Sequence, residues 1–88
     1  MSNEFFTTRD ITLAATIMSE GIEVQYIDFQ IEGSRGTVGY FNFENSVEVN
    51  VINKDYMNGK IKVEPKTFIT NLRYLKSEVN GYNKKPGK

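Results

Sequence analysis

Residues 21–45 read GIEVQYIDFQIEGSRGTVGYFNFEN, and no other stretch of the chain is as rich in aromatic and β-branched residues. These residue types suit the pleated, half-buried surface of a β-sheet. Residues 33–36, Gly-Ser-Arg-Gly, interrupt the run, and glycine supplies the positive φ that a short hairpin loop needs. The pattern therefore predicts a β-hairpin over residues 22–43.

The position of the loop also predicts which residues of the two strands lie opposite one another. If residues 33–36 form the loop, Glu32 faces Thr37, and one side of the hairpin is almost wholly apolar. The expected pairs on that side are Ile31–Val38, Phe29–Tyr40 and Ile27–Asn42, and those on the other side are Gln30–Gly39, Asp28–Phe41 and Tyr26–Phe43. Part-way along each arm, the alternation of apolar and polar residues shifts by one position. This shift fits either a β-bulge or packing on both faces at the base of the hairpin. We favour packing on both faces, because the two arms shift at matching heights.

A helix is predicted before the hairpin. Thr7 and Asp10 have the spacing of a capping box, so we expect the helix to run from about Thr8 to Glu20. Gly21 follows as a residue that can adopt the left-handed cap. The apolar positions keep helical spacing; they are Ile11, Leu13, Ala14, Ala15, Ile17 and Met18. The first six residues are expected to be loose, although two phenylalanines there could attach them to the core.

A second helix is predicted near the end of the chain. Pro65 suits its first position, where the missing N–H is not needed, and Asn80-Gly81 suits its end. The residues with helical spacing are Phe68, Leu72, Leu75 and Val79. Residues after Gly81 show no apolar periodicity. We expect one domain over residues 1–82 and a mobile basic tail over residues 83–88.

The segment between the hairpin and the last helix is ambiguous. Alternating valines over residues 47–51 indicate a strand, whereas Asn45 and Glu48 have capping-box spacing and Asn58-Gly59 is typical of a helix end. The short alternating segment 60–63 could add an edge strand. The expected fold is α+β, with helices packed on a hairpin-centred antiparallel sheet in the order α-β-β-α-(β)-α.

Composition excludes several kinds of site. The chain has 88 residues, no net formal charge, no Cys and no His. It therefore has no thiol nucleophile, imidazole base or usual zinc ligand. No catalytic, cofactor-binding or metal-binding residues are predicted, and we expect the protein not to be an enzyme. No apolar run is long enough to span a bilayer, so we expect a soluble cytoplasmic protein without membrane contact.

Several short motifs together resemble a known family. They are Phe-Thr-Thr-x-Asp with Leu-Ala-Ala, Gly at 21, Phe-x-Phe at 41–43, Tyr-Met-Asn-Gly at 56–59, and Val-x-Pro with Leu-x-x-Leu-Lys near the end. This pattern resembles a family of small uncharacterised domains found mainly in phages and prophages, over about residues 5–79. The resemblance favours a helix over residues 45–57 and implies a small phage accessory protein, without any catalytic residue to transfer.

The charged residues give weak indications of function. Glu44 and Glu48 are interpreted as charges that favour a helix start. Asp28 is a candidate contact residue because its predicted neighbour across the hairpin is Phe41, but a solvent-facing charge or a buried acceptor is the favoured interpretation. Arg35 at the hairpin tip could contact a partner, but a solvated charge is favoured there too. Residues 1–82 hold eight basic and 11 acidic groups, and their formal charge of −3 argues against tight binding to a nucleic-acid backbone.

Aromatic residues are the best functional indication in the sequence. The chain has 11 of them, more than a small core needs, and an exposed aromatic patch usually marks a protein contact. The candidate partner-binding residues are Tyr26, Asp28, Arg35, Phe41 and Phe43, although for the two phenylalanines core packing is the favoured interpretation and contact, including self-association, is the alternative. We expect a protein partner, with a host factor that the protein modulates or inhibits as the candidate, and a homodimer. The alternative is a nucleic-acid-binding accessory protein that uses exposed aromatics and the basic tail.

Overall fold

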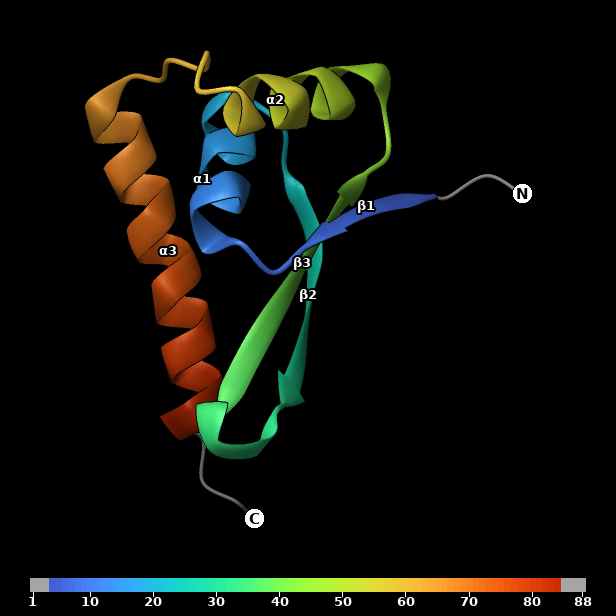
Figure 1. Ribbon diagram of the computed structural model, residues 1–88. Coiled ribbons are helices and arrows are strands. Elements are labelled where there is room, and N and C mark those ends of the chain that lie inside the picture. Colours follow the sequence, from blue (N-terminus) through green and yellow to red (C-terminus); the bar gives the residue numbers. More distant parts are fainter. Residues whose placement is uncertain (1–3, 85–88) are drawn as a thin grey trace.

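A three-stranded antiparallel sheet and three helices form an α+β fold in the computed structural model, which describes residues 4–84 (Figure 1). The order of elements is β-α-β-β-α-α. The strands are β1 (Phe5–Thr8), β2 (Val24–Ile31) and β3 (Thr37–Glu44), the helices are α1 (Ile11–Ser19), α2 (Val47–Met57) and α3 (Pro65–Lys84), and a 3₁₀ turn, η1 (Gly33–Arg35), joins β2 to β3.

The central strand of the sheet is β3, with β1 on one side and β2 on the other. The predicted hairpin of β2 and β3 is confirmed, but β1 was not predicted. Within the segment that was expected to be loose, Phe5 pairs with Glu44 and Phe6 with Phe43, while residues 1–3 lie outside the described residues. Conversely, residues 60–63, the predicted edge strand, form no strand.

The predicted register of the hairpin is wrong by one residue. Ile31 lies opposite Thr37, Phe29 opposite Gly39 and Ile27 opposite Phe41. The loop is longer by one residue than expected, because Glu32 donates its backbone N–H to the carbonyl of Gly36 and takes no part in the strand pairing. Since side chains alternate between faces, the shift turns every side chain of β3 to the other face.

The corrected register also decides between the two explanations for the phase shift in β2. The pairing slips between Val24 and Tyr26, which marks a β-bulge at Gln25. For β2 our preference for packing on both faces was therefore wrong, whereas β3 pairs with both neighbours without a bulge of its own. The bulge lets Val24 and Ile27 both contact the core although they are three residues apart.

The helix ends show which capping predictions hold. Asp10, not Thr7, caps α1, because its Oδ1 accepts hydrogen bonds from the backbone N–H groups of Thr12 and Leu13 at 3.0 and 3.2 Å. Gly21 has φ +92° after this helix, as predicted. The ambiguous segment is a helix, α2, whose cap is Ser46, not Asn45.

The last helix is longer than predicted. Pro65 is its first residue, but Asn80-Gly81 does not end it, and α3 continues to Lys84. The ring of Tyr82 stacks on Phe29 of β2, with centroids 4.5 Å apart and planes inclined by 8°, and this contact stabilises the last turn. Of the predicted tail, residues 83 and 84 thus belong to α3, and residues 85–88 lie outside the described residues.

The hydrophobic core lies between one face of the sheet and the helices. In Figure 1, α1 lies between the sheet and α3, and α2 crosses one end of the sheet. The buried apolar residues are Leu13, Ala14, Ala15, Ile17, Phe41, Phe43, Val49, Ile52 and Leu75. At about 2–3 kcal/mol for each large side chain, their burial is the main source of stability.

Candidate functional site

No helix within residues 4–84 covers the face of the sheet turned away from α1 and α3 (Figure 1), and two aromatic rings meet on this face. Phe5 on β1 and Tyr26 on β2 come from the two outer strands, yet their ring centroids lie only 5.4 Å apart, edge to face. They therefore reach across the central strand β3. Phe5 is 39% exposed and Tyr26 50% exposed. We call this side of the sheet the open face.

A buried amide lies on this face. Asn42 of β3 pairs with both Thr7 and Tyr26, and it is only 5% exposed. Its Oδ1 accepts a hydrogen bond from the Thr7 hydroxyl, and its Nδ2 donates to the backbone carbonyls of Tyr40 and Tyr26 at 3.1 and 3.4 Å. Because each polar atom of the amide has a partner, its burial stabilises one arrangement of the three strands.

A charged cluster occupies the hairpin end of the open face. The guanidinium of Arg9 lies 3.4 Å from Oε1 of Glu32 and 5.8 Å from the ring centroid of Tyr40. The Tyr40 hydroxyl donates a hydrogen bond to Oε2 of the same glutamate. The three side chains hold one another in place, and they connect the residue after β1 to the loop after β2.

The predicted contact residues divide between the surface and the core. Tyr26 and Asp28 lie on β2 and are exposed on the open face, where Asp28 pairs with Tyr40 rather than with Phe41. Phe41 and Phe43 point the opposite way and are buried in the core, so they are not part of the open face. Arg35 lies in η1, and its side chain is outside what the structure describes.

Two surface residues were not predicted, Phe5 and Arg9. Both depend on β1, which has only four residues and no clear alternation of apolar and polar types. Its partner strand is more than 30 residues away in the sequence, so no local pattern indicates the pairing. The two adjacent phenylalanines at positions 5 and 6 were the available signal, since neighbouring strand residues face opposite sides of a sheet.

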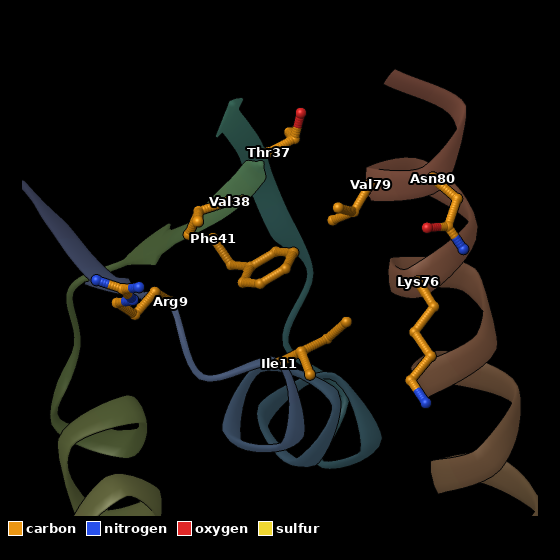
Figure 2. Close-up of a pocket in the computed structure, with 9 residues that line it drawn as sticks. Arg9, Ile11, Thr37, Val38, Phe41, Lys76, Val79 and Asn80 are labelled. Carbon is orange, nitrogen blue, oxygen red and sulfur yellow. The ribbon is translucent and has the colours of Figure 1, made fainter. Parts of the chain in front are cut away.

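A hollow of about 370 Å³ lies on the other side of the sheet, between the hairpin and the second half of α3. Helix α1 has nine residues and α3 has 20, about 14 and 30 Å in length, so α3 extends beyond α1. Figure 2 shows Phe41, Ile11 and Val79 pointing toward one another in this hollow, from β3, α1 and α3. Lys76 and Asn80 lie beside Val79 on α3.

Gly39 brings α3 close to the sheet at one wall of the hollow. A Cβ atom at this position would lie 3.1 Å from Cγ2 of Val79 and 3.3 Å from Cζ of Phe41. The floor of the hollow is apolar, and Lys76, Arg9 and the amide of Asn80 lie at its margin. Its described lining residues include no carboxylate, so they provide hydrogen-bond donors but no carboxylate base.

The titratable groups with shifted pKa values lie elsewhere, and each has a structural explanation. Burial of Tyr56, then its hydrogen bond to Asp10 and the negative charge of that carboxylate, raise the pKa of the phenol. Hydrogen bonds from the Thr67 side chain and backbone and from the Lys66 backbone lower the pKa of Glu64 at the start of α3. Glu48 lies in the first turn of α2, as its interpretation as a helix-start charge predicts.

The part of the chain from residue 4 to residue 84 contains no group of three acidic side chains placed to hold a metal ion. Within the same residues, no helix has both the length and the apolar content that crossing a membrane requires.

Comparison with protein families gives a match that spans most of the chain. A model described as a domain of unknown function, DUF5659, matches residues 3–82, which is most of the chain and includes every strand. The chain belongs to this family. The match confirms the expected membership of a family of uncharacterised domains, whereas the individual motifs and the phage origin stay predictions. Neither curated proteins nor solved structures give a match to this DUF5659 domain.

Proposed function

We propose that this DUF5659 domain is a non-enzymatic accessory protein of a phage or prophage, which acts in the bacterial cytoplasm by binding another protein. Its partner docks on the open face of the sheet and is a host factor that the domain modulates or inhibits. The phage origin rests on the resemblance of the sequence motifs. The binding mode rests on the Phe5–Tyr26 pair, which places two exposed rings side by side on a face without helices.

The geometry of the open face supports this proposal. Large apolar or aromatic side chains that cluster on a surface usually mark a contact with another protein, and tyrosine and arginine are enriched at such contacts. The buried hydrogen bonds of Asn42 and the Arg9–Glu32–Tyr40 cluster hold the surface in one conformation before a partner arrives. Such preorganisation lowers the entropic cost of binding.

Charge indicates the chemistry of the partner. Glu44 and Asp28 flank the ring pair on the open face, whereas Arg9 is already paired with Glu32. Over the sequence, residues 1–48 hold eight acidic and two basic groups, and residues 49–88 hold three acidic and nine basic groups. The sheet half of the chain is therefore acidic, which favours a partner with apolar and basic side chains.

A capture experiment with matched variants tests the proposal. The wild-type domain, a Phe5→Ser/Tyr26→Ser variant and a Val47→Ser/Met57→Ser control are immobilised and exposed to a bacterial lysate. The control removes two exposed apolar side chains of α2, far from the ring pair in sequence. We expect one protein to bind the wild type and the control at micromolar concentration and to be lost with the Phe5/Tyr26 variant. No specific partner, or equal capture by all three, would count against the proposal.

Nucleic-acid binding is the second candidate, and the outer side of α3 favours it. Lys66 and Arg73 are exposed and seven residues apart, so they lie on one face of this helix, in the basic half of the chain. Single-stranded DNA should then bind at low salt, less well as salt rises, and less well again when Lys84–Lys88 are deleted. A flat titration at low salt would eliminate this candidate.

A further inference from the structure

Strand β2 has the features of an edge that pairs with another strand. It lies at one margin of the sheet, it has eight residues, and none of its side chains is fully buried. Proteins usually protect such an edge with a short strand, a charged side chain (most often lysine), a proline or a β-bulge. The one charge of β2 is Asp28, and its bulge at Gln25 lies before residues 27–31. The sequence of β2, VQYIDFQI, contains neither lysine nor proline. The opposite edge of the sheet, β1, is only four residues long.

The sequence of this edge is nearly symmetric about one residue. Residues 27–31 read Ile-Asp-Phe-Gln-Ile, so the segment is almost the same in both directions from Phe29. An antiparallel pair of two such segments centred on Phe29 places Ile27 of each copy opposite Ile31 of the other. We propose that two copies of this chain form a homodimer in this way, with a continuous six-stranded sheet.

This register gives favourable side-chain contacts on both faces of the sheet. On the helix side, Ile27, Phe29 and Ile31 of one copy meet the same three residues of the other, and Ile31, 75% exposed in the single chain, gains an apolar neighbour. On the open face, each Asp28 lies opposite a Gln30. Within one chain, Gln30 Nε2 already donates to Asp28 Oδ2 at 3.3 Å, so the amide and the carboxylate can hydrogen-bond.

The neighbouring registers are less favourable. Centring the pair on Asp28 would place the two carboxylates directly opposite, where like charges destabilise a sheet. Centring it on Ile27 would bring the bulge at Gln25 into the pairing and disrupt the ladder of hydrogen bonds. A two-fold axis at Phe29 also gives a closed dimer, because the same surface of both copies is used.

This dimer does not depend on the proposed function, since it uses the edge of β2 rather than the Phe5–Tyr26 pair. Sedimentation equilibrium from micromolar to millimolar concentration measures the mass, which should approach twice the 10.1 kDa of one chain. Ile31→Lys should raise the dissociation constant by more than about tenfold, because it places a charge at the apolar side of the pair. Val47→Lys makes the same kind of change on α2, at a residue that is 81% exposed, and should leave the dimer intact.

A cross-linking experiment tests the register itself. The chain has no cysteine, so each introduced thiol is the sole one in its chain. An oxidised mixture of Asp28→Cys and Gln30→Cys chains should give mixed covalent dimers, and either variant alone should give far fewer. A wild-type chain that stays monomeric, an Ile31→Lys variant that still dimerises, or equal cross-linking of each variant alone would overturn the proposal. If β2 instead pairs with a peptide strand of another protein, the purified wild-type chain would be monomeric in sedimentation equilibrium.

Discussion

The carboxylate of Asp10 joins two helices, because its Oδ2 accepts a hydrogen bond of 3.0 Å from the Tyr56 hydroxyl while its Oδ1 caps α1. Residues 10 and 56 belong to segments that are far apart in the sequence. One side chain thus satisfies backbone donors at the start of α1 and fixes α2 against it.

A double-mutant cycle measures this connection. Asp10→Ala should lower the free energy of unfolding by about 1–2 kcal/mol, because it removes a helix cap and a hydrogen-bond acceptor. Tyr56→Phe should cost about 0.5–1.5 kcal/mol. The double variant should lose less than the sum of the two, since both remove the same hydrogen bond. Denaturant titrations of the four proteins give these values, and strict additivity would show that the two residues are not coupled.

The raised pKa of Tyr56 predicts a loss of stability in alkali. The folded state favours the neutral phenol through burial and through its contact with Asp10. The contribution is therefore complete below the pKa of an unfolded tyrosine, about 10, and is lost as the pH rises through the higher pKa of the folded state. The unfolding free energy of Tyr56→Phe should fall less steeply above this pH than that of the wild type. Coincident profiles of the two proteins would contradict the prediction.

The lowered pKa of Glu64 predicts a loss of stability in acid. Its Oε1 accepts hydrogen bonds of 2.7 Å from both the backbone N–H and the hydroxyl of Thr67, and these favour the charged form. The contribution is present above the ordinary pKa of a glutamate and is lost as the pH falls through the lower pKa of the folded state. Glu64→Gln should show a flatter decline of the melting temperature between neutral and acidic pH. An unchanged decline would argue against a capping role for the carboxylate.

The close approach of α3 to the sheet at Gly39 gives a packing prediction. Gly39→Val should lower the unfolding free energy by about 1–3 kcal/mol, because its Cβ atom would lie 3.1 Å from Val79 and 3.3 Å from Phe41, so these side chains would have to move to make room for the larger residue. Val79→Ala shortens the opposing side chain and makes room. The double variant should therefore lose less than the sum of the single losses. Additive losses would show that the side chains at positions 39 and 79 do not contact each other.

The hydroxyl of Thr7 gives a prediction for β1. Thr7→Val should cost about 1–3 kcal/mol, because it removes a donor from the buried amide of Asn42. Thr70→Val is the control, since Thr70 is exposed on α3. Chemical denaturation should show little change for the control. Equal stability of both variants would mean that the amide finds another partner.

The sequence predicted those elements of the fold that have local signals. The hairpin and the last helix follow from alternation, glycine and proline. The register of the hairpin could not be predicted from these local signals, because Glu32 belongs to the loop. One extra loop residue exchanges the faces on which the side chains of β3 are expected. The end of α3 was placed too early because Gly81 is a typical helix stop, whereas the stacking of Tyr82 on Phe29 is a tertiary contact that no local pattern reveals.

The candidate site was predicted only in part, for the same reason. Tyr26 was a candidate residue and lies on the open face, but its partner Phe5 was expected in a loose segment. Phe41 and Phe43 had both core and contact interpretations, and both side chains lie buried in the core on the helix side of the sheet. The large number of aromatic residues indicated an exposed contact surface. Its position depends on the pairing of β1 with β3, which no local pattern indicates.

That pairing has a consequence for the order of events during synthesis. Residues 5–8 leave the ribosome first, but the residues they pair with, 41–44, follow only after another 32 have been added. The hairpin and α1 can form in the meantime, whereas the first strand has no sheet to join. We therefore expect the N-terminal strand to be added last, and Asn42 to lose contact with water only at that step.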